Sequence, residues 1–349
     1  MRTHVLNGVV ISVLFIGWSG VLQGQELETG SVDSLLTRGI HRVLLQEYED
    51  ADTIFRYLSD SFPGHPAGPL YRAALLQSKA LDFNEVLHRN LFDSLLDAGR
   101  HKAERVITEM PDRPHGYFYV GTAQGLDSYA RAVGGDWFGG IARGLSAVSM
   151  FREALQRDSA LYDARVGIGT YLYWKSKAIG FLTWLPFISD DREEGILLLK
   201  ESIARGRYNR FAALSSLIYV YIDREAYTLA AETARTGLEV YPENRNFLWG
   251  LATALDRGGQ ISGAIRAYER LLTGILAGSV PNPYGELVCR LNLSRLLVAE
   301  GSVNSADHHL ERILALENGR IPGHLTDRAK PKFREARELK TRLAQKNGR

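Results

Sequence analysis

The sequence predicts an all-α protein, an α-α superhelix of about seven antiparallel helix pairs with a capping helix at the C-terminus. Apolar residues recur at helical spacing through most of the chain, two stretches align at a separation of 34 residues, and proline is sparse, with 11 in 349 residues. A period of this length is typical of stacked helix pairs, because no pair buries its apolar face without its neighbours. The net charge of +2 gives no reason to expect a nucleic-acid partner.

The N-terminus has the pattern of a secretory signal peptide at residues 1–24. Arg2 precedes an apolar run from Val9 to Trp18, and the small and polar residues that follow predict cleavage after Gly24. An uncleaved membrane anchor is the alternative. We therefore expect an exported protein, periplasmic or associated with the cell envelope, in which residues 25–32 form a linker to the folded part.

Cys289 is the only cysteine, so the chain forms no internal disulfide and its core must hold it together. This residue stands at helical spacing with Leu293 and Leu297. The spacing predicts a buried apolar side chain and not a nucleophile.

The repeat is clearest between residues 209–242 and 243–276. The aligned pairs are Leu217 with Leu251, Tyr221 with Leu255, Ala230 with Ala264, and Ala234 with Tyr268. Within the second copy, a helix pattern breaks at Gly258-Gly259 and another follows, whereas Pro242 ends the second helix of the first copy. These units resemble tetratricopeptide (TPR) repeats. The resemblance implies a right-handed solenoid in which small residues lie where helices cross and the first helices line a concave, protein-binding face.

The same template recurs over residues 33–319, the predicted repeat domain. Residues 33–63 fit well, with Gly39 at the small position of the first helix and Phe55 on the second. The stretch from Leu70 to Pro111 is long enough for one more pair but fits the template poorly. We expect about seven pairs in all.

The first of two insertions lies near residues 126–145, where five glycines surround Trp137 and Phe138. A phosphate-binding loop would need a preceding strand and a Gly-Lys-Ser/Thr ending, and the sequence has neither. We therefore expect the glycines to permit a tight turn and close helix contact.

The second insertion lies near residues 174–190 and includes the apolar segment 178–188 with Trp184. This segment is too short to span a bilayer and too apolar to be left in water. We expect a first helix that continues past Trp174, a break at Pro186, and a second helix capped by Asp190. A partner-binding or membrane-surface patch and a small apolar ligand pocket are the alternatives. Candidate patch residues of the two insertions are Trp137, Phe138 and Trp184.

Residues 320–349 are predicted to form a basic capping helix and tail, with Pro331 near the helix start. One apolar stripe consists of Phe333, Ala336, Leu339 and Leu343. The stripe favours a helix that closes the stack, and the cationic face leaves contact with an anionic surface as the alternative.

No catalytic, cofactor-binding or metal-binding residue is predicted. The nine histidines include no His-x-x-x-His pair, and no Gly-x-Ser-x-Gly motif is present. The candidate partner-binding residues on the concave face are Tyr219, Trp249, Thr253, Arg257 and Arg295. Aromatic residues and arginine dominate the energetics of protein interfaces.

Three functions remain open at this point. The first is a non-enzymatic scaffold that binds a protein or peptide in the cell envelope. The second is a membrane-associated accessory factor for envelope assembly or transport, which uses the Trp184 segment and the basic C-terminal helix. The third is an enzyme or small-ligand binder with a pocket around Trp137 and Trp184.

Overall fold

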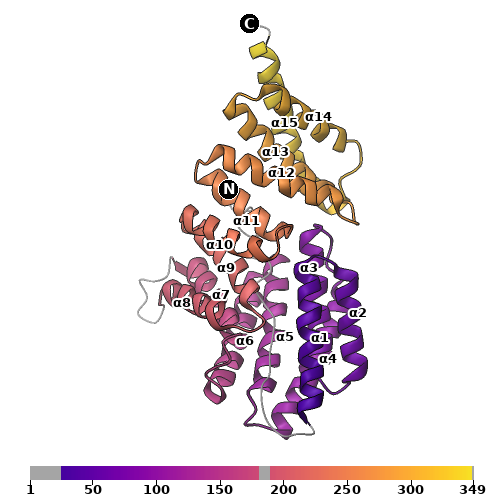
Figure 1. Ribbon diagram of the computed structural model, residues 1–349, viewed down its shortest axis with the longest axis vertical. Helices are drawn as coiled ribbons and strands as arrows, with labels where there is room; N and C mark the ends of the chain where they lie inside the picture. Colours follow the sequence, from indigo (N-terminus) through magenta and orange to yellow (C-terminus); the bar gives the residue numbers. More distant parts are fainter. Residues whose placement is uncertain (1–24, 181–188, 348–349) are drawn as a thin grey trace. The chain divides into compact units, whose positions relative to one another are not determined.

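The computed structural model describes residues 25–180 and 189–347, with side chains for 31–180 and 189–345. All regular structure in these ranges is helical, in fifteen α-helices and one short 3-10 helix (Figure 1). The helices are α1 (Gln25–Leu44), α2 (Tyr48–Ser61), α3 (Ala67–Asp82), α4 (Arg89–Glu109), α5 (Pro114–Val133), α6 (Trp137–Arg157), α7 (Ala164–Ile179), α8 (Arg192–Arg205), α9 (Arg210–Asp223), α10 (Tyr227–Val240), α11 (Arg245–Arg257), α12 (Ile261–Ala277), α13 (Pro283–Glu300), α14 (Val303–Leu316), the 3-10 helix η3 (Gly323–Leu325) and α15 (Thr326–Asn347).

The all-α prediction is confirmed, and helices that are adjacent in sequence pack on each other. Such packing links α1 with α2, α4 with α5, α5 with α6, α6 with α7, α7 with α8, and each helix from α10 to α14 with the next. The last helix, α15, also packs on α13, the first helix of the last pair. The predicted signal peptide at 1–24, Trp184 and Pro186 lie outside the described residues.

The chain divides into two compact units. The first, unit 1, consists of Met1–Lys79 and Leu87–Val220, and the second, unit 2, consists of Ala80–Val86 and Tyr221–Arg349. No helix of the described ranges is both long enough and apolar enough to cross a membrane.

In unit 1, aromatic side chains fill the space left by small residues on neighbouring helices. A methyl group at Gly39 would stand 2.2 Å from the Phe55 ring, and the Phe151 ring has Gly121 on one side and Gly167 on the other. Phe55 and Phe151 are fully buried. The poorly fitting stretch also forms a helix pair, because Leu70 of α3 packs directly against Gly99 of α4.

In unit 2, the aligned repeat positions form the core. Ala230, Ala234, Ala264 and Tyr268 are all buried, as the 34-residue alignment predicts. The Cys289 thiol is fully buried and donates a hydrogen bond to the carbonyl of Tyr268 at 3.3 Å, so its predicted role as core filler is confirmed. The four residues of the predicted stripe on the C-terminal helix are buried as well: Phe333, Ala336, Leu339 and Leu343.

Three helix starts differ from the expectation. The helix α1 begins at Gln25, so the segment predicted as a linker is helical, and the buried residues of this helix include Val32, Leu35 and Leu36. The N-cap of α8 is Asp191 and not Asp190, whose carboxylate instead accepts the backbone N–H of Arg192 at 3.2 Å.

The third difference is that α15 begins at Thr326, which places Pro331 inside the helix. Proline there cannot donate a hydrogen bond to the carbonyl four residues earlier. The early start has a packing reason, since Leu325 and Ala329 are buried one helical turn apart ahead of the proline.

Candidate functional site

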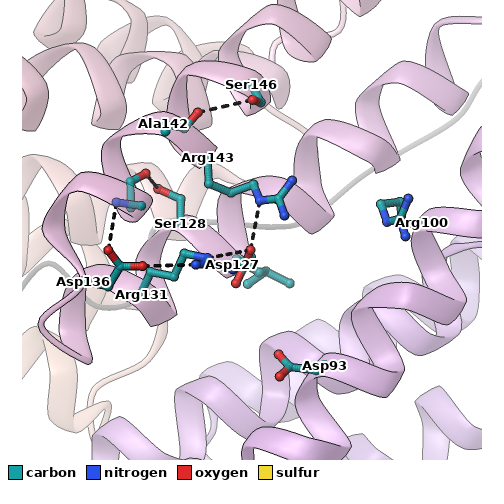
Figure 2. A network of polar contacts seen from close by, with 12 residues as sticks. Asp93, Arg100, Asp127, Ser128, Arg131, Asp136, Ala142, Arg143 and Ser146 are labelled. Carbon is teal, nitrogen blue, oxygen red and sulfur yellow. Dashed lines mark hydrogen bonds and ion pairs between the residues drawn. The ribbon is translucent and has the colours of Figure 1, made fainter.

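The long hairpin of α5 and α6 in unit 1 is held by one carboxylate. Asp127 accepts hydrogen bonds from Arg89 of α4 at 2.9 Å, Arg131 of α5 at 3.0 Å and Arg143 of α6 at 2.9 Å. Figure 2 shows Arg131 and Arg143 converging on this group. Burial alone would raise the pKa of Asp127, but the surrounding arginines outweigh it and lower the pKa. Asp127 is therefore ionised and fastens three helices together.

The tip of the hairpin is fixed by a second carboxylate, that of Asp136. It caps α6 through the N–H of Gly139 at 2.9 Å and accepts from Arg131 at 3.1 Å (Figure 2). The preceding turn uses Gly135 at φ +93°, a left-handed conformation that favours glycine. The glycine-rich segment thus forms the tight turn and close helix contact that the sequence predicts.

This fixed tip presents two of the predicted patch residues to solvent. Phe138 is 89% exposed and Trp137 is 44% exposed, although both are large apolar side chains. The third patch residue, Trp184, lies outside the described residues.

Four of the five predicted concave-face residues lie in unit 2, and three of these four, Trp249, Thr253 and Arg295, gather around Tyr268 and Asn292. The Trp249 ring meets the Tyr268 ring edge-on, with centroids 6.1 Å apart. The Tyr268 hydroxyl accepts from the Asn292 amide at 3.0 Å, and Thr253 lies near that hydroxyl. Arg295 donates to the Asn292 oxygen at 3.1 Å. The group joins α11, α12 and α13, and none of its buried side-chain polar atoms lacks a partner in the described residues.

The charged members of this group lie at its exposed edge. Arg295 also donates to Glu335 of α15 at 2.5 Å, and Arg257 is exposed at the end of α11. Burial raises the pKa of Asp256, and the nearby Arg295 and Arg257 oppose that rise. The two arginines therefore flank one partly buried carboxyl. That these residues bind a partner stays a prediction.

Tyr219, the fifth predicted residue, lies on α9 in unit 1, where it faces different neighbours. Its phenol is close enough to that of Tyr129 on α5 to raise the pKa of Tyr129, in addition to the larger effect of burial. The helix α7 contributes Trp174, which stands next to Tyr173. The Tyr173 hydroxyl donates to the carbonyl of Val220 on α9 at 3.4 Å. α5 and α7 are in contact.

These three side chains, Tyr129, Trp174 and Tyr219, form what we call the aromatic face of unit 1. Each comes from the first helix of its pair, and each is part-exposed. The Tyr129 hydroxyl and the Trp174 indole N–H are shielded from solvent, yet neither has a hydrogen-bond partner in the described residues. An unsatisfied polar group of this kind costs about 1–3 kcal/mol. Because both atoms are covered in the unliganded protein, a ligand pairs with this donor and this hydroxyl only when the side chains that cover them move aside on binding.

Four of these residues were not predicted from the sequence: Tyr129, Trp174, Asn292 and Glu335. Asn292 stands three residues before Arg295, and this helical spacing could have revealed it. Tyr129 and Trp174 lie in the two lengthened units, where the 34-residue template no longer gives the register. Nothing in the sequence pairs Glu335 with Arg295, 40 residues away.

No group of three or more His, Cys, Asp or Glu side chains in the described ranges is arranged to hold a metal ion. His65 and His309 are buried enough that the pKa of each falls to about 4, with nearby cations adding to the effect. Both imidazoles are therefore neutral at physiological pH.

Among solved structures, the chain is similar to the C-terminal part of a TPR repeat-containing protein from Cytophaga hutchinsonii. The two share 17% sequence identity, the match covers 82% of this chain and 96% of that one, and the TM-score is 0.44. No protein-family model matches the sequence, and none of the curated proteins does. The class of the protein, an all-α array of antiparallel helix pairs, therefore rests on its own helix packing.

Proposed function

We propose that the protein is a non-enzymatic scaffold that binds a polypeptide segment on the aromatic face of unit 1. The observation that carries the proposal is the pair of shielded, unpartnered polar atoms, the Tyr129 hydroxyl and the Trp174 indole N–H. A peptide backbone alternates donors and acceptors, so a bound segment supplies a carbonyl to the indole and an N–H to the phenol. Stacked helix pairs commonly present such extended binding surfaces.

Tyrosine and tryptophan suit this role for a second reason. Their rings bury a large apolar area at a small cost in side-chain entropy, and they are enriched among the residues that dominate binding energy. Tyr219 extends the face onto a third helix, so that α5, α7 and α9 each contribute one ring. Location in the cell envelope rests on the leader pattern of residues 1–24 and stays a prediction.

The proposal is tested with linear random peptides selected on the purified protein and then titrated against variants. We expect Tyr129→Phe to weaken binding about 3- to 10-fold, because one hydrogen bond contributes about 0.5–1.5 kcal/mol. The same change should leave the melting temperature equal or higher, because it removes an unsatisfied hydroxyl.

Tyr173→Phe is the matched control. The Tyr173 hydroxyl already donates to Val220, so its loss should lower stability and leave peptide affinity within twofold. Selection of no peptide, or of peptides that bind wild type and Tyr129→Phe equally, would reject the proposal.

The exposed tip favours a second candidate, a membrane-associated accessory factor. Trp137 and Phe138 project from a fixed turn, and aromatic side chains partition readily to the membrane interface. We expect the protein to float with anionic vesicles at low salt and the double variant Trp137→Ser, Phe138→Ser to remain at the bottom of the gradient. Leu145→Ser, at another exposed apolar position of α6, is the control. If wild type does not float, this candidate is wrong.

A further inference from the structure

The last helix, α15, concentrates positive charge, with eight Lys or Arg and three Asp or Glu in its 22 residues. Several of these cations are neutralised within unit 2. The ion pairs are Lys330 with Asp327 at 2.9 Å, Arg337 with Glu317 at 2.6 Å, and Lys340 with Glu311 at 3.0 Å. Lys332 differs from these cations because it has no ion-pair partner in the described residues. Its surroundings come from α13 and α15.

The face of α15 that carries Lys332 runs along α13. One turn before it, the Arg328 guanidinium lies over the ring of Tyr284, 5.1 Å from the ring centre. One turn after it, Glu335 accepts from Arg295 at 2.5 Å. Because Tyr284 and Arg295 are both on α13, these two contacts align the helices and leave Lys332 between them.

Lys332 is part-buried and has no hydrogen-bond or ion-pair partner among the described residues. Burial lowers its pKa, and the positive charges of Arg295 and Arg328 lower it further. Glu335 is the one carboxylate that acts against this shift, and it is already bonded to Arg295. Three cations thus lie close together, and of the two carboxyl groups near them Glu335 is already bonded to Arg295 and Asp256 lies beside Arg295.

We infer that Arg295, Arg328 and Lys332 form an oxyanion-binding site in unit 2, which takes a carboxylate or phosphate group of a ligand. The ammonium offers a point charge at the centre and Arg328 offers directional donors, whereas Arg295, whose nitrogens already contact Glu335 and Asn292, adds mainly its positive charge. A bound oxyanion would offset the mutual repulsion of the three cations, which water at a part-buried position screens incompletely. The inference does not depend on the proposed peptide site, because it uses other residues in the other unit.

The test is calorimetric titration of the purified protein at low ionic strength with two separate probes, inorganic phosphate and a glutamate-rich peptide. We expect at least one probe to bind and to raise the melting temperature. The probe that binds identifies the source of the oxyanion. Lys332→Gln should weaken that binding at least tenfold without lowering the melting temperature of the unliganded protein, since it removes an unpartnered cation.

Lys330→Gln is the matched control. Lys330 lies on the same helix two residues away, is exposed and is paired with Asp327, so its replacement should change the affinity by less than twofold. Two results would overturn the inference. One is that neither probe binds, and the other is that the two lysine variants lose affinity equally, which would show diffuse attraction to a basic helix.

Discussion

Gly195→Val should unfold unit 1 or lower its free energy of unfolding by several kcal/mol. A Cβ atom at Gly195 would stand 2.6 Å from the carbonyl oxygen of Gly169 and 3.1 Å from the backbone nitrogen of Tyr173. Both atoms belong to the main chain of α7, so no side chain can rotate away to make room. The helices α7 and α8 would have to separate, and overpacking of this kind commonly costs about 1–3 kcal/mol or more.

Gly195→Ala tests the same contact with the smallest side chain, and Gly274→Ala is its control. In α12 a Cβ at Gly274 would meet its nearest neighbour at 3.5 Å, an ordinary van der Waals distance. Alanine there should stabilise the helix by about 0.5–1 kcal/mol, because it restricts the unfolded chain and favours helix. Chemical denaturation measures the change in the free energy of unfolding for both alanine variants. Equal effects of the two alanine variants would contradict the close crossing of α7 and α8.

Asp163→Ala should have a comparable effect for a different reason. The side chain is 4% exposed, and its carboxylate accepts backbone N–H groups of Asn209 at 2.8 Å, Tyr208 at 3.1 Å and Arg207 at 3.3 Å. It therefore ties the start of α7 to the loop before α9. Alanine leaves these donors without an acceptor. Each donor that stays buried lowers the free energy of unfolding by about 1–3 kcal/mol. Urea denaturation at pH 6 measures the loss, and a change below about 1 kcal/mol would contradict the role.

The same carboxyl should make stability depend on pH. Burial raises the pKa of Asp163 to about 7 from 3.8, although hydrogen bonds from Asn209 and Arg207 oppose the rise. Between pH 3.8 and about pH 7, folding is therefore coupled to the uptake of a proton by Asp163. The contribution of this proton to the free energy of unfolding is fully present below pH 3.8 and is lost as the pH rises through about 7.

Comparison with Asp163→Asn isolates this contribution, because the variant keeps an acceptor oxygen and does not titrate. Between pH 4 and pH 8, the stability of wild type should fall relative to the variant by on the order of 4 kcal/mol. A constant difference across this range would show that the carboxyl is ionised throughout.

The fold was predictable where the repeat is regular. Phe55 and Tyr268 occupy positions that the periodicity assigns, because each layer of the stack requires a large side chain opposite a small one. Prediction was weaker where helices lengthen. α3 and α4 still cross at Leu70 and Gly99, but α4 extends to 21 residues, so the spacing of the template is lost. The start of α15 ahead of Pro331 follows from burial of Ala329, which only the packed structure reveals.

The candidate site was predictable only in part. The sequence identifies Tyr219 and Arg295 as first-helix residues, because the well-fitted repeats fix their register. It does not reveal that the group around Arg295 satisfies its own hydrogen bonds through Asn292 and Glu335, whereas the group around Tyr219 has unpartnered atoms. Hydrogen-bond satisfaction depends on which side chains meet in space, and the repeat pattern contains no such information.

The indole N–H signal of Trp174 in a ¹⁵N-labelled sample tests the proposed binding face most directly. It is assigned by its disappearance in Trp174→Phe, and the signal of Trp249 serves as an internal reference. On saturation with a selected peptide, the Trp174 proton should move downfield, because the indole gains an acceptor, while the Trp249 signal stays in place. A Trp174 signal that does not move at saturation, or a shift confined to Trp249, would contradict the proposal that this face binds a polypeptide.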